Sequence, residues 1–177
     1  MYKPDESEYH PYYTRYTKLV PDGHILDILE YQLVTVLEIF NTIEDKKALY
    51  RYAENKWSIK ELLGHLIDTE RVFLYRALCI SRQDKKELPG YDQNSYVENA
   101  HFDEQSLNDL LEQFEITRTG FIKFYKSLST EKWRTVGTAD GKKLSVRSIA
   151  YIMAGHVIHH LRVLKRQYLD QQDKSPK

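Results

Sequence analysis

Apolar residues recur at intervals of three and four over four long stretches of the chain, a spacing that places them on one side of an α-helix. These stretches cover about residues 23–42, 58–80, 105–127 and 145–168. Strand-like alternation of apolar and polar residues is nearly absent. The pattern therefore predicts an all-α protein, a four-helix bundle whose core forms between the apolar faces.

The sequence also predicts how these helices begin and what joins them. Ser58 followed by Glu61 forms a capping-box pattern at the start of the second helix. The polar passage from about 44 to 57 is expected to cross in extended form. The longer connection 83–104 is expected to contain a short helix at about 92–98, since structureless loops of that length are uncommon. Asp140-Gly141 predicts a small hairpin before the last helix.

No internal repeat and no Pro- or Gly-rich linker divides the 177 residues. The chain is expected to form one domain over residues 1–177, with a core at about 16–169. The first dozen residues and the tail from Asp170 are polar enough to be expected to fray.

Charge and composition limit the kinds of molecule that this protein is expected to bind. Lys plus Arg and Asp plus Glu each number 26, so no overall basic excess attracts nucleic acid or anionic lipid, and neither partner is expected. The first eight residues contain no apolar leader, and no apolar run is long enough to span a membrane, so a cytoplasmic protein is expected. Cys79 is the single cysteine; it excludes an internal disulfide and is expected to be a small core residue.

Histidines supply the candidate chemistry. On the last helix His156 and His160 are four residues apart and fall on its apolar face, while His159 falls at the edge with the arginines. A third histidine, His65, borders the apolar face of the second helix. Buried imidazoles cost free energy unless their nitrogens are hydrogen-bonded or bound to metal, so a metal site and a hydrogen-bonded structural cluster both fit this spacing.

Other polar and aromatic residues surround these histidines in the sequence. Asp68 fits a proton acceptor, a partner for a ligand imidazole or a solvated charge equally well, whereas Glu61 is better explained as the helix cap. Trp57 is expected to anchor packing, and Arg162 to lie on the surface. Four tyrosines lie in the connections that we expect to flank the mouth of the site: Tyr50, Tyr52, Tyr91 and Tyr96.

Two histidine-bearing segments carry a family resemblance. Residues 56–68, KWSIKELLGHLID, and residues 155–160, GHVIHH, resemble the second-helix and final-helix signatures of the DinB-like superfamily. Residues 91–97 and 136–147 resemble the branch that contains the YfiT-type metal-dependent hydrolases and the bacillithiol transferases. The resemblance extends over about residues 16–168 and implies the same four-helix bundle.

The resemblance implies that His65, His156 and His160 are the three protein ligands of a divalent ion, nickel or zinc. Three neutral imidazoles leave such an ion its full charge and open positions, as in catalytic rather than structural sites. An ion of this kind can activate either water or a thiol.

Three functions therefore stay open. The resemblance favours transfer of a low-molecular-weight thiol, such as bacillithiol, to an electrophilic small molecule. Hydrolysis of a small amide or ester is the alternative, and a metal-binding bundle without turnover is the third. A homodimer is also possible, because several apolar residues need not all fit one core: Tyr31, Leu33, Tyr151 and Ile158.

Overall fold

A computed structural model of the chain describes residues 2–170. Its four long helices are α2 (Ile25–Asn41), α3 (Ile59–Ser81), α5 (Leu107–Lys126) and α7 (Val146–Val163). They confirm the four predicted helices to within a few residues, and α7 continues into a π-helical turn, Leu164–Leu169. Among the described residues no helix is long and apolar enough to cross a membrane.

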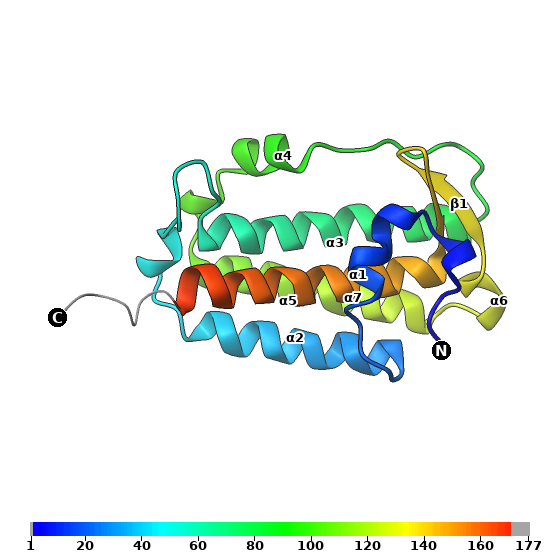
Figure 1. Cartoon of the computed structure of the whole chain (residues 1–177), viewed down its shortest axis with the longest axis horizontal. Helices are drawn as coiled ribbons and strands as arrows, with labels where there is room; N and C mark the ends of the chain where they lie inside the picture. The colour runs from blue at the N-terminus through cyan, green and yellow to red at the C-terminus, as the bar shows by residue number, and fades with distance from the viewer. Residues whose placement is uncertain (1, 171–177) are drawn as a thin grey trace.

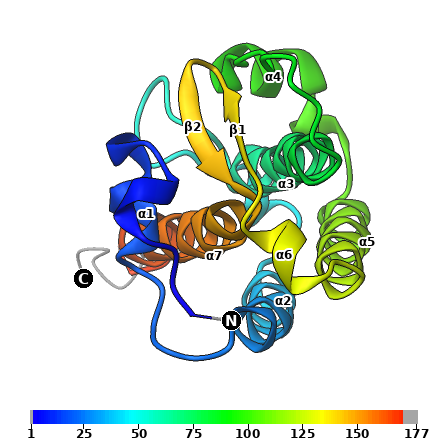
Figure 2. The same cartoon turned by 90° about the vertical axis from the view of Figure 1, so that its right-hand side faces the viewer.

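The four helices form a bundle in which consecutive helices are not always neighbours. The main contacts pair α3 with α5 and α7, and α2 with α5 and α7. Seen along the bundle, α2 and α3 are diagonally opposite, as are α5 and α7 (Figure 2). Because α7 runs antiparallel to α3, the first half of α3 faces the second half of α7 (Figure 1).

Short elements complete the chain between and before these helices. They are α1 (Thr14–Thr17), α4 (Gln93–Ala100), α6 (Thr130–Trp133), and the 3-10 turns Glu6–Glu8, Pro11–Tyr13, Lys47–Leu49 and Phe102–Glu104. The helix α4 confirms the predicted short helix, and the Asp92 side chain caps it by accepting a hydrogen bond from Asn94 N at 2.9 Å. The passage after α2 is less extended than expected, because Lys47–Leu49 coils into a turn.

Capping by serine sets the start of the two helices that carry the histidines. The Ser58 hydroxyl accepts from Glu61 N at 3.0 Å, and the Glu61 carboxylate accepts from Ser58 N at 2.8 Å, which confirms the predicted capping box. Ser145 and Ser148 form the equivalent reciprocal pair at the start of α7.

The predicted hairpin is present. Strands β1 (Val136–Ala139) and β2 (Lys142–Ser145) pair antiparallel, and the turn residues Asp140 and Gly141 have φ of 54° and 64°. Positive φ at both turn residues suits the right-handed twist of a two-residue hairpin. Leu88 pairs with Ala139 along the outer edge, so the long connection after α3 is tied to the hairpin.

The core consists of two apolar clusters separated by a buried polar layer. The Arg118 guanidinium pairs with Glu70 and donates from Nη1 to Gln32 Oε1 at 3.1 Å, and Gln32 Nε2 donates to the carbonyl of Ala154 at 2.9 Å. Arg118 and Glu70 are fully buried. Each of the four long helices contributes to this layer, which the apolar pattern did not predict.

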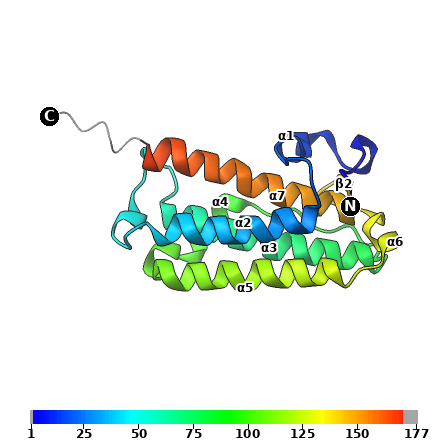
Figure 3. The same ribbon diagram turned by 90° about the horizontal axis from the view of Figure 1, so that it is seen from below.

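Part of the N-terminal segment that was expected to fray packs against the rest of the fold. Tyr9 and Tyr13 are buried, and the Glu8 carboxylate accepts from Ser145 Oγ at 2.9 Å and pairs with Arg147. These contacts hold residues 5–17 against α7 (Figure 3). Of the tail expected to fray, residues 171–177 lie outside the described part.

The residues proposed for a dimer interface do not share one exposed face. Tyr31 is exposed, but Tyr151 is buried within the core, and Leu33 and Ile158 are half-buried. Residues 2–24 fold back over this side of α7 and extend the core. Tyr151 therefore cannot form part of an exposed patch.

Candidate metal centre

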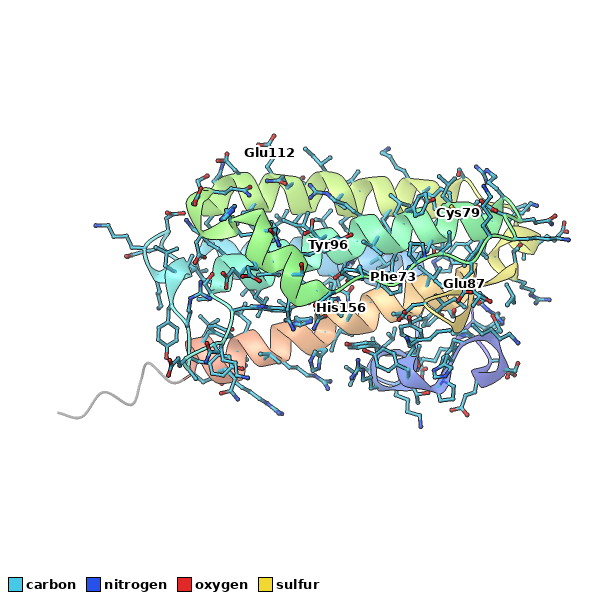
Figure 4. The ribbon with its side chains drawn as sticks, turned by 90° about the horizontal axis from the view of Figure 1, so that it is seen from above. Phe73, Cys79, Glu87, Tyr96, Glu112 and His156 are labelled. Carbon is cyan, nitrogen blue, oxygen red and sulfur yellow. The ribbon has the colours of Figure 1, made fainter. Side chains whose placement is uncertain are left out.

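Three histidines from two helices meet at the middle of the bundle. His65 lies in the second turn of α3, and His156 and His160 lie one turn apart on α7. The Nε2 atom of His156 lies 3.0 Å from Nε2 of His65 and 3.1 Å from Nε2 of His160. Figure 4 shows His156 on α7, between that helix and α3. The helical spacing alone brings together the pair on α7, and only the fold adds His65.

The two distances from His156 to the other ring nitrogens suit ligands of one ion. One donor nitrogen from each ring lies within 4.8 Å of the others. Imidazole nitrogens that bind one zinc ion at its usual bond length lie roughly 3.0–3.4 Å apart for bond angles between octahedral and tetrahedral. A hydrogen-bonded cluster fits less well, since a neutral ring nitrogen either donates or accepts, and His156 Nε2 faces two other ring nitrogens.

Burial keeps these imidazoles neutral. It lowers the pKa of His65 to about 4 and that of His160 to about 2, and it holds the pKa of His156 well below its ordinary value. Their lone pairs are therefore available for a metal at neutral pH. The Nδ1 atom of His156 is buried without a hydrogen-bond partner among the described residues, whereas its Nε2 faces the other two imidazoles.

Aromatic rings flank the cluster on both sides. The ring of Trp57 lies against that of His65 at 4.7 Å between centroids, and Tyr16 packs edge-on against His156 at 5.4 Å. Trp57 was expected only to anchor packing, but its contact also fixes the orientation of a candidate ligand. His159 is exposed and contacts Tyr16, as predicted for a residue at the rim.

The nearby carboxylates have other partners. Glu61 caps α3 and pairs with Arg51, as its capping role predicts. Asp68 is partly buried and accepts from Arg71 at 3.1 Å. Burial raises the pKa of Asp68, and Arg71 opposes that rise. Within residues 2–170 no hydrogen bond joins a carboxylate to any of the three histidines. Their ring nitrogens instead lie close to one another.

A cavity of about 470 Å³ opens beside the histidines. It is bounded by the N-terminal segment, the middle of α3, the connection before α4, the hairpin and α7. Its lining residues include Tyr12, Tyr13, Arg15, Tyr16, Thr69, Phe73, Arg76, Tyr91, Asp92, Asp140, Lys142, His156, His159 and His160. Figure 4 shows Phe73 on α3, on the side that faces α7. The cavity has the size of a small-molecule site and adjoins the candidate metal centre.

The tyrosines of the connections are divided between the two ends of the molecule. Tyr91 lines the cavity, where its hydroxyl lies 2.9 Å from Thr69 Oγ1, and Tyr96 packs against Tyr91. Tyr50 and Tyr52 instead contact Tyr168 at the end of α7. Only two of the four therefore flank the mouth. Tyr12, Tyr13 and Tyr16 line the cavity instead, and no apolar periodicity marked them.

The fold and the histidine cluster together define a helical bundle with a candidate metal centre between two of its helices. The family model of the DinB superfamily matches residues 28–164, so the chain belongs to the DinB superfamily. No curated protein matches the sequence.

Two solved structures resemble the fold. YfiT from Bacillus subtilis, described as a probable metal-dependent hydrolase with an unusual four-helix bundle topology, is 14% identical with a TM-score of 0.66, covering 83% of this chain and 91% of that one. The mycothiol-dependent maleylpyruvate isomerase is 12% identical with a TM-score of 0.66, covering 82% of this chain and 61% of that one. At these identities the likeness shows a shared fold.

Proposed function

We propose that this protein is a metal-dependent enzyme that transfers a low-molecular-weight thiol to an electrophilic small molecule. The observation that carries the proposal is a neutral three-histidine cluster of which two members, His156 and His160, line a cavity of small-molecule size. His65, His156 and His160 would hold a divalent ion, nickel or zinc. When bound, such an ion supplies a positive charge that lowers the pKa of a coordinated thiol or water.

The surroundings of the cluster suit a thiol better than water. Attack by water benefits from an adjacent carboxylate as general base, and the carboxylates described above are engaged elsewhere. A thiol needs a pocket for its polar body instead. Burial raises the pKa of Tyr13 to about 12 and also raises that of Tyr91, so both hydroxyls stay protonated and can donate to such a ligand.

A metal-dependent hydrolase of a small amide or ester is the alternative, supported by the description of YfiT. Asp68 would be its proton acceptor, because it follows His65 by three residues and burial raises its pKa toward the range of a general base. A bundle that binds metal without turnover is the third candidate.

Monochlorobimane conjugation tests the proposal. The protein loaded with nickel or zinc is incubated with the bimane and, in turn, with glutathione, cysteine, coenzyme A, bacillithiol and mycothiol. We expect metal-dependent conjugation with at least one thiol, retained in His159→Ala and lost in His156→Ala. No conjugation with any thiol would overturn the proposal. Acid release from esters or amides that is lost in Asp68→Asn would support the hydrolase instead.

A further inference from the structure

Arg76 is a buried arginine in the wall of the cavity, and among the described residues no carboxylate forms an ion pair with it. Its side chain belongs to α3, and the residue is only 3% exposed. Within the described chain its one hydrogen bond runs from Nη2 to the carbonyl of Pro89 at 2.9 Å, and it forms no ion pair. A buried charge is costly unless it is paired, so an unpaired guanidinium facing a cavity indicates a site for an anion.

Aromatic rings hold this guanidinium in place. Its Cζ lies 4.9 Å from the ring centre of Phe73 and 5.9 Å from that of Tyr91. These contacts and the bond to Pro89 restrict the side chain but use only part of its donors. The Nε and Nη1 atoms have no partner among the described residues and are not sealed from solvent, so they can still donate to a ligand.

The acidic residues of the cavity have closer partners than Arg76, although Lys142, helped by the charge of Arg76, lowers the pKa of Asp140. Asp140 pairs with Lys142, and its side chain lies against Gly90, where a Cβ would come within 2.3 Å of Asp140 Oδ1. Asp92 accepts from Asn94 N at the start of α4. Arg15 adds a further positive charge at the rim, where it stacks on Tyr12 and Tyr16. The cavity is therefore electropositive even before an ion is bound.

The position of Arg76 determines how long a ligand must be to contact both Arg76 and the histidines. Arg76 follows His65 by eleven residues on α3, close to three full turns, so both lie on nearly the same face, about 16 Å apart along the axis. Helical side chains lean toward the N-terminus, which brings the guanidinium closer to the histidines. A molecule whose reacting atom lies at the histidines would reach Arg76 with a group several bonds away.

We propose that Arg76 binds a carboxylate of the small molecule that occupies this cavity, at the end remote from the three histidines. A single unpaired guanidinium suits a carboxylate, which it can bind through parallel hydrogen bonds, better than a doubly charged phosphate. The inference rests on the proposed function insofar as the reacting thiol lies at the histidines. The substrate class is then an extended thiol, or its electrophile, bearing a carboxylate.

This inference is tested by comparing the affinities of two thiols that differ only in whether they end in a carboxylate. The cobalt-loaded protein is titrated with mercaptooctanoate and with mercaptooctanol, and the visible absorption of cobalt reports thiol coordination. We expect the carboxylate to bind roughly 10- to 100-fold more tightly, the range for one hydrogen bond to a charged group. Mercaptopropionate, too short to span the distance, is expected to show a smaller preference over mercaptoethanol. Equal affinity of the two longer thiols would overturn the inference.

Three variants identify the residue responsible. Arg76→Gln is expected to abolish the preference while leaving the affinity for mercaptooctanol unchanged, and a preference that survives would contradict the assignment. Arg82→Gln removes an exposed charge from the residue that follows the same helix and is expected to keep the full preference. Should Arg76→Gln fail to fold by circular dichroism, Arg76→Lys keeps the charge without the planar fork, and an undiminished preference in that variant would also count against the inference.

Octanoate separates this inference from the proposed function, since it contains no thiol. Calorimetry on the metal-free protein is expected to show octanoate binding that Arg76→Gln removes and Arg82→Gln retains. If the cobalt spectrum responds to no thiol while octanoate binding depends on Arg76, the proposed thiol chemistry fails and the carboxylate site stands. If thiols bind to the cobalt-loaded protein but Arg76→Gln leaves octanoate binding unchanged, the carboxylate site is refuted while the proposed thiol chemistry stands.

Discussion

Gly155 of α7 lies directly against the backbone of Tyr16. A Cβ on Gly155 would lie 2.0 Å from the carbonyl oxygen of Tyr16 and 2.5 Å from its carbonyl carbon. Only glycine permits this approach, which brings the N-terminal segment onto α7 beside His156. The same contact closes one side of the cavity with the ring of Tyr16.

Gly155→Ala is therefore expected to destabilise the protein by roughly 1–3 kcal/mol, because the obstructing atoms belong to the backbone. Gly120 on α5 is the matched control, since a Cβ there meets nothing within 4 Å and alanine favours a helix interior by roughly 0.5–1 kcal/mol. Urea unfolding of both variants measures the difference. A stabilised Gly155→Ala would show that the N-terminal segment does not pack as described.

Breaking the buried pair between Glu70 and Arg118 should be among the most damaging single changes. Glu70→Gln leaves a fully buried guanidinium without its counter-charge, and we expect a loss of roughly 3–5 kcal/mol of unfolding free energy. The control is Glu30→Gln, which breaks the exposed pair with Lys126 and should cost no more than about 1 kcal/mol. Similar losses in the two variants would argue against a buried charged layer.

The metal-free protein should lose stability as the pH falls below about 6.5. Burial lowers the pKa of His65 to about 4 and that of His160 to about 2, so the unfolded chain binds more protons than the folded one in this range. The stabilisation is complete above pH 6.5 and is lost on acidification, by up to about 1.4 kcal/mol per pH unit for each imidazole.

Urea unfolding between pH 7.5 and 5.5 measures that slope. We expect His160→Gln to reduce it, because one titrating imidazole is removed. A slope that is insensitive to His160 would mean that this ring is not buried in the neutral form.

Metal binding should raise the melting temperature, because an ion bound only by the folded state stabilises it by mass action. Free ion at 100 times the dissociation constant contributes about 2.7 kcal/mol. Differential scanning calorimetry with and without nickel or zinc measures the shift, and EDTA should reverse it. An unchanged transition at saturating metal would indicate that no ordered site forms.

The bundle could be predicted from the sequence because helical periodicity, serine caps and an Asp-Gly turn are local signals. Ser58 and Asp140-Gly141 each act within a few residues, and the structure confirms the capping box and the hairpin that they predicted. Helix spacing likewise placed His156 and His160 on one face and His159 at the rim. Pairing that face with His65 needed the fold, and the sequence supported it only through the family resemblance.

The parts that could not be predicted depend on contacts between distant residues. Gln32 and Arg118 are polar yet buried, and nothing in their own helices indicates that they meet across the bundle. The N-terminal residues were expected to fray because they are polar, but Glu8 finds its partners 137 and 139 residues away. The sequence likewise did not indicate a role for Arg76, because that role depends on the lack of a direct ion pair among the described residues, which only the fold reveals.

Elemental analysis of purified protein tests the central claim, that His65, His156 and His160 together hold one divalent ion. The account predicts about one equivalent of nickel or zinc in the natural protein and in His159→Ala, and its loss in His65→Ala, His156→Ala and His160→Ala, with all variants folded by circular dichroism. Equal metal content in all of these proteins would contradict it.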